Sequence, residues 1–578
     1  MKIKHFFGLA VIAAMTASCS SNEDLGTAGP GTGTNEAGVG YATFTINLPS
    51  TSGSTSGARG TRATGDPTMD EGDPTEYAVK SATVLIFQKY GSDEGSYKFV
   101  ESVTLPTAAA DWSDDTTPGI TTSKKLVAKL TNVDTKNQYS VLVLLNNEKT
   151  GGVKVELPTV GQSYNDWNNK VLTPSVAELA ATGDFYMANA PLNVGASPTT
   201  LVNIDNSKIY PTEEKAKTLE SAATVYVERG VAKISVSDPA SKTVKDKATK
   251  VDTKSTVDFS NWALDITNKK TYAVHNIDGL STDFSAIWTT ARFTGTNSRI
   301  YWGMDPNYSN NILKETDKDT ERRAEFNFIT ATSEIDKTFA EPVYCLENTF
   351  NLANMYQGQT TRVIFKATYA PKDNAGNSLA DAADGTFYTI GNMTTILNTD
   401  KLKAAVDAVA TPVLPTGYTI DYPNFKKEGS HVITLEDIKD ATGATLVAGT
   451  DYSGKTGTQI VADINAKLGL KDGRDEAKVG INTYAKGVTY YIARVKHFGD
   501  ALPWASGEVY GDKNDKYLGR YGMLRNNWYE LKVGNVYGPG YPGVPPVDPT
   551  LPDDENEKYL SVSVKILSWA KWSHSYDL

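Results

Sequence analysis

Two short segments near opposite ends of the chain show the same alternation of apolar and polar residues. Residues 41–48 carry an apolar side chain at every second position, and residues 559–566 repeat this arrangement. A period of two directs alternate side chains to one face of a β-strand, so both segments are predicted to be strands with one apolar face. The apolar positions are Ala42, Phe44, Ile46 and Leu48 in the first segment and Leu560, Val562, Val564 and Ile566 in the second, which is followed by Trp569.

Each predicted strand adjoins a segment that is rich in small residues or proline. Residues 49–64 (PSTSGSTSGARGTRAT) form a Ser/Gly-rich loop that carries Arg59 and Arg62. Proteases cut such exposed loops, so the two arginines are candidate cleavage sites; the alternative is an ordinary surface loop with two solvated arginines. Residues 538–558 are rich in proline and end in acidic residues. This composition predicts an extended, solvated linker that reaches about 60 Å in polyproline II geometry.

Between these strands the chain is predicted to be mainly β, because threonine, valine, tyrosine and glycine are frequent and long helical periodicities are scarce. Continuous apolar runs such as 140–145 (SVLVLL) are typical of strands buried on both faces. The predicted strands are 79–87, 138–145, 224–236, 259–264, 344–352, 361–369, 386–388, 487–496 and 529–536, and the predicted helices are 175–181, 213–222, 401–410 and 458–468.

The length of 578 residues and a polar stretch after Ser237 favour two tandem antiparallel β-sandwich-like domains decorated with short helices. The first domain is expected over residues 63–240 and the second over residues 241–537. The other expected segments are a signal (1–18), a flexible tether (19–40), a removable strand and loop (41–62), a proline-rich linker (538–558) and a terminal strand (559–578).

The first 18 residues have the three parts of an export signal. Lys2 and Lys4 precede an apolar run over residues 6–15, and small residues stand directly before Cys19. The apolar run is too short to span a membrane. The small residues before Cys19 and the polar residues after it resemble a bacterial lipoprotein signal, although Thr16 stands where leucine is usual. We therefore expect Cys19 to be lipidated and to become the N-terminus, with simple secretion as the alternative.

Charge and residue inventory exclude several classes of function. The formal net charge of -11 would repel nucleic acid and anionic membrane surfaces. With only Cys19 and Cys345, no disulfide framework is expected, and Cys345 is predicted to be a buried apolar residue. The single, scattered histidines show no zinc spacing. A GxGxxG pattern at residues 538–543 contains prolines and precedes no helix. No nucleophile elbow is present. We predict no enzyme, no metal and no cofactor.

Landmarks spread over nearly the whole chain carry a family resemblance. In order they are the signal ending at Cys19, the strand 41–48 before Arg62, VYVERGVAKISVS (225–237), LRNNWYELKV (524–533), the proline-rich linker and YLSVSVKILSWAKWSHSYDL (559–578). Together they resemble the fimbrillin superfamily of Bacteroidales, the subunits of type V pili. VERGVAKI and RNNWY are characteristic of the superfamily, and the linker and terminal segment resemble most closely the shaft subunit of the minor (short) fimbriae. The sequence between the landmarks is divergent.

The resemblance implies a structural shaft subunit of a cell-surface fimbria that supports adhesion or biofilm formation. Such a subunit is exported as a lipoprotein precursor to the outer membrane, where an arginine-specific surface protease removes a propeptide strand. Arg62 is preferred over Arg59 because RATGD resembles the family's mature start. The C-terminal donor strand of another subunit then fills the opened groove. The implied partners are identical subunits in a head-to-tail polymer, tip and anchor fimbrial subunits, the protease, and host or bacterial receptors.

A surface lipoprotein that binds glycan or another nutrient is the competing hypothesis. Trp302, Trp504 and Trp528 could stack on sugar rings, and core packing is the alternative use of each tryptophan. The two hypotheses differ in whether proteolysis converts a monomer into oligomers.

Overall fold

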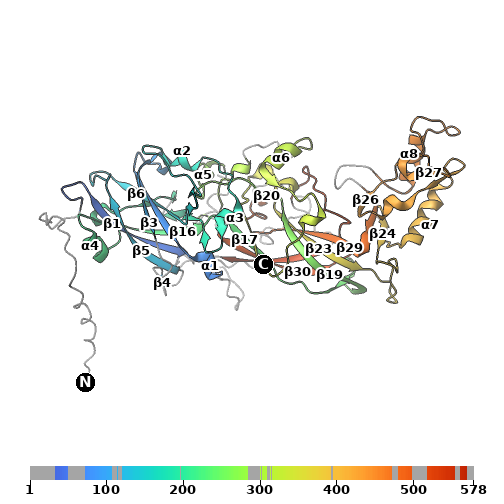
Figure 1. Cartoon of the computed structure of the whole chain (residues 1–578), viewed down its shortest axis with the longest axis horizontal. Coiled ribbons are helices and arrows are strands. Elements are labelled where there is room, and N and C mark those ends of the chain that lie inside the picture. The colour runs from blue at the N-terminus through green and yellow to red at the C-terminus, as the bar shows by residue number, and fades with distance from the viewer. Residues whose placement is uncertain are drawn as a thin grey trace, which may run out of the picture.

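The structure is a computed structural model. It describes residues 33–49, 72–106, 113–114, 120–194, 197–283, 300, 302–308, 313, 315–391, 395–471, 479–497, 517–553 and 560–568. Figure 1 shows an elongated molecule with two β-sheet regions in succession and a smaller mixed unit at the far end. The fold is mainly β with short helices, as the sequence predicts. Within the described residues, no helix is long and apolar enough to cross a membrane.

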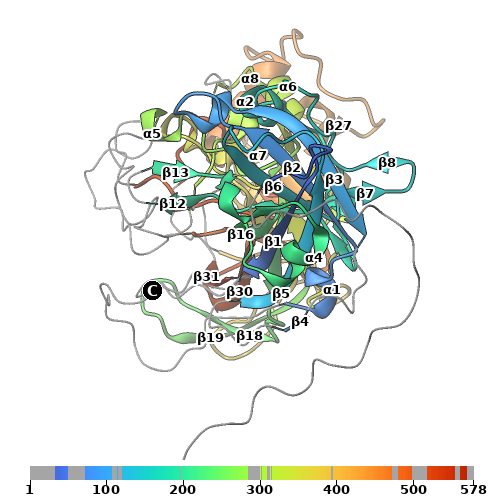
Figure 2. The ribbon, with the colours of Figure 1, turned by 90° about the vertical axis from the view of Figure 1, so that its left-hand side faces the viewer.

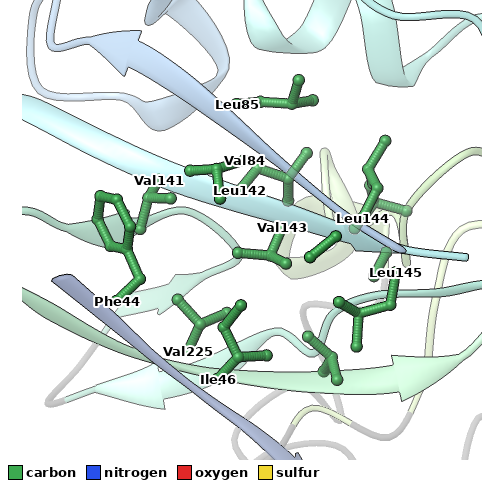
Figure 3. Packing of buried hydrophobic residues seen from close by; sticks show 14 of the residues in the cluster. Phe44, Ile46, Val84, Leu85, Val141, Leu142, Val143, Leu144, Leu145 and Val225 are labelled. Atoms are coloured by element: carbon green, nitrogen blue, oxygen red, sulfur yellow. The ribbon is translucent and has the colours of Figure 1, made fainter. Parts of the chain in front are cut away.

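The first region is a ten-stranded sheet, called here the N-terminal sheet, with the order β3-β2-β6-β11-β16-β1-β5-β4. Strands β14 and β15 join it by pairing with β6 and β1. Phe44, Ile46 and Val225 face Val141 and Val143 across its core (Figure 3). The strands are β1 (Gly40–Pro49), β2 (Ser81–Gln88), β3 (Lys98–Pro106), β4 (Ser113–Asp114), β5 (Ile120–Leu130), β6 (Tyr139–Leu145), β11 (Met187–Asn189), β14 (Val202–Asn203), β15 (Ile209–Tyr210) and β16 (Ala223–Arg229).

The second region is an eight-stranded sheet, called here the C-terminal sheet, with the order β22-β17-β30-β18-β19-β23-β29 and with β31 paired to β30. A separate hydrophobic core that includes Trp262, Phe365 and Tyr529 supports it. Its strands are β17 (Ala232–Val236), β18 (Lys242–Lys245), β19 (Asp252–Asp265), β22 (Val343–Cys345), β23 (Arg362–Ala370), β29 (Val488–Arg494), β30 (Asn527–Val536) and β31 (Leu560–Ser568).

The third region, called here the inserted unit, lies between β23 and β29 in sequence. Because β23 and β29 are neighbours in the C-terminal sheet, the chain leaves and re-enters at one edge. Two helices, α7 (Thr399–Ala410) and α8 (Gly457–Lys467), contribute Leu402, Val406, Ile460 and Ile464 to its own core. The sequence predicts both helices but not the separate core. The strands of the unit are β24 (Phe387–Ile390), β25 (Tyr418–Ile420), β26 (Gly429–His431), β27 (Ile438–Asp440) and β28 (Ile481–Tyr484).

Short elements complete the described fold. The remaining helices are short and lie over or beside the sheets (Figure 1). The helices are α1 (Pro74–Tyr77), α2 (Tyr164–Asn168), α3 (Val176–Leu179), α4 (Glu213–Thr218), α5 (Leu280–Asp283) and α6 (Asp319–Glu325). The paired short strands are β7 (Glu148–Lys149) with β8 (Gly152–Val153), β9 (Ala180–Ala181) with β10 (Asp184–Phe185), β12 (Leu192–Val194) with β13 (Ser197–Thr199), and β20 (Thr267–Asn268) with β21 (Phe326–Asn327).

The predicted strand 224–236 is wrong as one continuous element. The chain forms β16, breaks at Gly230 and Val231, and continues as β17 in the other sheet. A Cβ at Gly230 would lie 3.0 Å from the Tyr186 ring, so a side chain there would crowd this ring at the change of sheet. The change from one sheet to the other comes before the domain boundary expected after residue 240. Ala273, Val274 and Leu346 lie beyond that boundary in sequence but pack in the core of the N-terminal sheet.

The predicted strand 344–352 is also too long. Only Val343–Cys345 is a strand, and a 3₁₀ helix occupies Leu352–Asn354. Asn348 is fully buried between them, and its side-chain amide donates to Asn268 and Tyr308. A buried amide needs such partners, and this polar cluster replaces the expected ladder.

The predicted antiparallel pairing holds for most strands, with three exceptions at the centres of the two large sheets. β1 pairs in parallel with β16, and β17 and β18 pair in parallel with β30. Both large sheets are therefore mixed, at β1 in the N-terminal sheet and at β30 in the C-terminal sheet. Hydrophobic alternation carries no information on strand direction, which is why the sequence did not show it.

Candidate donor and acceptor strands

Strand β1 lies in the middle of the N-terminal sheet. On one side it pairs with β5 in antiparallel register from Gly40 to Pro49, and on the other it pairs with β16 in parallel. The alternation seen in the sequence is realised fully, because the four apolar side chains point into the core and are essentially inaccessible to solvent. These residues are Ala42, Phe44, Ile46 and Leu48. Removing β1 would therefore open an apolar groove flanked by two strands with unpaired backbone groups.

The opposite face of β1 is covered by helix α4 and the chain that follows it. Thr43 Oγ1 donates to the Ala216 carbonyl at 2.5 Å, and the Ala222 amide donates to the Thr43 carbonyl at 2.7 Å. Thr45 Oγ1 lies 2.7 Å from Ser221 Oγ. Thr43 and Thr45 thus have their own partners, and β1 is held on both faces and both edges.

Two polar atoms near the C-terminal end of β1 are less well satisfied by hydrogen bonds. Asn47 is 3% exposed and Thr122, which pairs with Leu48, is 5% exposed. Asn47 Oδ1 and Thr122 Oγ1 have no hydrogen-bond partner within the described residues. A buried polar atom without a partner costs about 1–3 kcal/mol, so this end of β1 is bound less tightly than its middle.

Strand β31 occupies a different kind of position, beside β30 at the edge of the C-terminal sheet (Figure 2). It runs antiparallel to β30, and its register sets positions 562, 564 and 566 opposite Val533, Leu531 and Tyr529. Those three residues of β30 are buried in the core. Residues directly opposite in a ladder share a face, so the alternate positions of β31 lie on the core face of this sheet.

The segment between β30 and β31 corrects the prediction of a solvated linker. No residue from 538 to 549 is exposed, and Asp553 is fully buried. Tyr490 and Tyr541 exchange both backbone hydrogen bonds, at 2.9 and 2.7 Å, along the edge of β29. A Cβ at Gly540 would lie 2.0 Å from the Tyr490 carbonyl oxygen, so only glycine allows this approach. We call residues 538–553 the strap.

A buried ion pair holds the middle of the strap. Arg362 on β23 donates from Nε to Asp265 Oδ2 on β19 at 2.8 Å, and both side chains are 1% exposed. The other two nitrogens of the guanidinium group donate to the carbonyls of Pro545 at 2.6 Å and Pro546 at 3.1 Å. The guanidinium group only donates hydrogen bonds, so it binds the two prolines through their carbonyl oxygens.

A second buried ion pair joins the two large sheets. Glu76 on α1 lies 2.7 Å from Lys233 Nζ on β17 and accepts from the Tyr344 hydroxyl on β22 at 2.5 Å. Lys233 Nζ also lies 3.8 Å from the centre of the Trp528 ring, and Arg229 Nε donates to the Glu76 carbonyl at 2.8 Å. Burial, with the Glu76 carboxylate next, raises the pKa of Tyr344. This cluster anchors the described chain that begins at residue 72.

The structure gives a role to the two motifs that mark the family resemblance. VERGVAKI supplies Arg229 and Lys233, and RNNWY supplies Asn526 and Trp528. Asn526 Oδ1 accepts from the Arg229 amide at 3.1 Å, which joins the two motifs directly. The sequence alone identifies these two motifs but does not show which contacts they make. Glu76, Asp265 and Arg362 were missed because each stands alone in the sequence.

Several predicted residues lie outside the described residues: Cys19, Arg59, Arg62 and Trp569. Lipidation and cleavage therefore stay predictions. Cys345 is buried as predicted, and burial raises the pKa of its thiol to about 12. Burial lowers the pKa of His497 to about 3, and its Nδ1 lies 2.9 Å from the Tyr529 hydroxyl. No group of three or more possible metal ligands occurs among the residues with described positions.

The tryptophans of the glycan-binding hypothesis are used in packing where the structure describes them. Trp302 is fully buried and stacks edge-on against Phe350, with ring centres 6.0 Å apart. Trp528 donates its indole hydrogen to Ser235 Oγ at 2.7 Å, and Lys233 covers its ring. Trp504 lies outside the described residues. Neither described ring is available as a flat platform for a sugar.

A sequence comparison finds a likeness over the C-terminal part of the chain. Residues 482–575 match the sequence profile of a family described as major fimbrial subunit protein type IV, fimbrillin, C-terminal. The matched range begins in β28 and runs through β29, β30, the strap and β31. Over this range, the chain is similar to the C-terminal part of fimbrillins. No curated protein is similar enough to this chain to count as a match.

Solved structures give weaker likenesses over most of the chain. A candidate cell adhesion protein from Parabacteroides distasonis has 10% identity and a TM-score of 0.36, covering 92% of this chain and 98% of its own. A candidate cell adhesion protein from Bacteroides eggerthii has 12% identity and a TM-score of 0.32, with 94% and 98% covered. A fimbrial assembly protein from Parabacteroides distasonis has 14% identity and a TM-score of 0.27, with 62% and 93% covered. At these scores the likenesses carry no argument.

Proposed function

We propose that this protein is a structural shaft subunit of a cell-surface fimbria and that it polymerises by exchange of β-strands between identical subunits. The position of β1 carries the proposal. A strand that lies between two others, with one face in the core, leaves on removal a groove that only another strand with the same alternation can fill. The C-terminal segment of the chain has that alternation and matches the fimbrillin profile.

The proposed sequence of events begins with export as a lipoprotein anchored at Cys19 to the outer membrane. An arginine-specific surface protease then cuts at Arg62, or at Arg59, in the loop that follows β1. The first described chain after this loop is α1, which the Glu76–Lys233 pair ties to the C-terminal sheet. Cutting the loop therefore separates β1 from the chain, while α1 stays held to the C-terminal sheet.

The energetics are compatible with the exchange. Relative to a strand exposed to solvent, burial of the four apolar side chains of Leu560, Val562, Val564 and Ile566 contributes roughly 1.5–3 kcal/mol each, or about 6–12 kcal/mol before ordering costs. Backbone hydrogen bonds on both edges of the groove add about 0.5–1.5 kcal/mol each. Asn47 Oδ1 and Thr122 Oγ1, without partners among the described residues, weaken the hold on the outgoing strand.

In the monomer, β31 rests on β30 with its alternate positions on the core face. This pairing uses one edge of β31, whereas the groove left by β1 would use two. The donor strand therefore gains a second ladder when it moves from its own subunit to the next one, and this gain favours the polymer. Tip and anchor subunits, and receptors on host or bacterial cells, are the further partners of such a fibre.

The maturation step is tested by replacing Arg59 and Arg62 together with alanine. The variant should stay monomeric when it is treated with an arginine-specific protease, because β1 is never released, whereas the wild-type chain should give a ladder of oligomers in size-exclusion chromatography. A variant in which Lys124 and Lys125, in β5, are replaced by alanine leaves both arginines in place and serves as the control. Normal oligomers from the double arginine variant would contradict the proposal.

The exchange step is tested by its demand for one face of the donor strand. Val562→Asp with Val564→Asp would bury two unpaired carboxylates in the groove and should abolish oligomers. Ser561→Asp with Ser563→Asp places the same charges on the other face and should assemble nearly normally. Both variants add two negative charges to the donor strand. Equal assembly by both would therefore contradict a donor strand that is bound through one face.

A further inference from the structure

The strap has a consequence for how subunits are joined. If residues 538–558 were free, as their composition suggests, β31 could reach a groove about 60 Å away. In the structure the chain is fixed at both ends of the strap, and Asp553 is the last described residue before β31. The question is whether the strap leaves its own domain when the donor strand does.

The contacts of the strap resemble those of the domain core rather than those of a linker. The Tyr491 and Tyr484 hydroxyls donate to the carbonyls of Gly538 and Gly540, each at 2.9 Å. The Tyr490–Tyr541 pair closes the outer edge of β29, which would otherwise present unpaired backbone groups. The first third of the strap thus acts as one more strand position of the C-terminal sheet.

The far end of the strap is fixed as firmly. The Gln357 amide donates to the Leu551 carbonyl at 3.0 Å, and the Asp553 amide donates to the Met355 carbonyl at 3.1 Å. Thr360 Oγ1 donates to Asp553 Oδ2 at 3.0 Å, in a fully buried position. Pulling Asp553 out would expose a core position and break each of these bonds, which are independent of β31.

We infer that the strap stays clamped to its own domain, with Arg362 as its positioning residue, while β31 alone passes to the next subunit. This inference rests on the proposed function. The pairing of Arg362 with Asp265 fixes the guanidinium group, whose other two nitrogens hold the carbonyls of Pro545 and Pro546. The strap and β31 have separate roles: the strap is a permanent part of the domain, and β31 is the exchangeable part.

The geometric result is a short reach. Six residues, 554–559, separate Asp553 from Leu560. At 3.3–3.6 Å per residue the exchanged strand begins no more than about 25 Å from Asp553. The partner is a second copy of this chain, and its opened groove must therefore begin within about 25 Å of Asp553. Successive subunits are held close together rather than strung on a long linker.

Two engineered disulfides test the strap and β31 independently of each other. A Cβ at Gly358 would lie 3.1 Å from the Pro549 Cβ, so Gly358→Cys with Pro549→Cys, after a small shift, bonds the strap to the domain. Lys532→Cys with Ser563→Cys bonds β31 to β30 on the face away from the core, where the register sets these residues opposite each other. Cys345 is buried with a raised thiol pKa and does not compete.

Both variants of the full chain are treated with arginine-specific protease, oxidised and reduced, and analysed by size-exclusion chromatography. The oxidised strap variant should form the same oligomers as its reduced form, and the oxidised β31 variant should form none until it is reduced. Oligomers that need reduction of the strap disulfide would overturn the inference. Oligomers from the oxidised β31 variant would instead overturn the proposed exchange itself, and the inference with it.

Hydrogen exchange gives an independent readout of Arg362. In wild-type protein the Tyr541 and Asp553 amides should be as protected in the polymer as in the monomer, and loss of protection on assembly would overturn the inference. Arg362→Lys keeps a positive charge for Asp265 but cannot also hold both proline carbonyls. In this variant, protection at Asp553 should fall by about tenfold, the equivalent of one lost hydrogen bond to a charged group. Unchanged protection at Asp553 would show that Arg362 does not position the strap.

Discussion

Strands β1 and β31 have the same alternation in sequence but opposite positions in the fold. β1 is paired along both edges and covered on both faces, whereas β31 is paired, within the described part of the chain, to β30 alone. A central strand cannot leave without opening its sheet, and an edge strand can. Under the proposed exchange, a covalent cut is therefore needed at the first strand, while the second needs only to detach.

The largest expected effect follows from deleting each strand in turn. Removal of residues 40–49 from the full chain should abolish cooperative unfolding of the N-terminal sheet, because its core loses Phe44 and Ile46 and its two halves lose their shared ladder. Removal of residues 560–568 should leave a folded monomer. Circular dichroism during thermal unfolding checks both results.

The control for this comparison is a synthetic peptide of residues 559–578. It should restore cooperative unfolding to the protein that lacks residues 40–49 and should not bind the intact chain, whose groove is already filled. Calorimetry measures both. Equal binding of the peptide to the two proteins would mean that β1 and the donor strand do not share a site.

Alternation in the sequence predicted both strands with their apolar faces, because a period of two is a local property. The register of β31 on β30 and the parallel pairing of β1 with β16 were not predictable, since both depend on which strands meet. The strap was misjudged because proline and glycine suggest solvation, whereas Pro545 and Gly540 are buried by partners distant in sequence, Arg362 and Tyr490. Lone charged residues such as Glu76 gave no signal for the same reason.

The second prediction concerns the pair that holds the subunit together once β1 is gone. Glu76→Gln leaves Lys233 buried without its counter-charge, and loss of one partner of a buried pair costs about 3–5 kcal/mol. Urea unfolding of the intact chain should show this loss, and unfolding after protease treatment should show at least as much. The control Glu178→Gln breaks an exposed pair with Lys149 and should cost less than about 1 kcal/mol. Equal effects of the two changes would contradict an anchoring role for α1.

The third prediction uses pH to weaken the half of the molecule that holds β1. Glu94 accepts from the Thr200 and Leu201 amides at 3.0 Å, and burial raises its pKa to about 7 from the ordinary 4.5. Its contribution to stability is complete below pH 4.5 and is lost as pH rises through 7. The unfolding free energy should therefore fall over this range.

Glu94→Gln removes this dependence and should reduce the fall by on the order of 2–3 kcal/mol in urea unfolding followed at several pH values. Burial also raises the pKa of Asp305 to about 7, so the variant keeps part of the slope. A slope identical to that of the wild-type protein would show that Glu94 stays ionised throughout.

The smallest expected effect is also the most specific test of the comparison. Ile46 is fully buried, and Ile46→Val should cost the uncut precursor about 0.5–1.5 kcal/mol by loss of one methylene group. Once β1 has been cut away and replaced, the same change should have no effect on the polymer. Ile566→Val should affect both states, because position 566 lies on the core face of the C-terminal sheet in the monomer and enters the groove of the next subunit in the polymer. Unfolding in urea, measured on precursor and on assembled protein, gives four values. Strand exchange requires that Ile46→Val affects the precursor alone, and an equal effect of Ile46→Val on the polymer would mean that β1 stays in its groove.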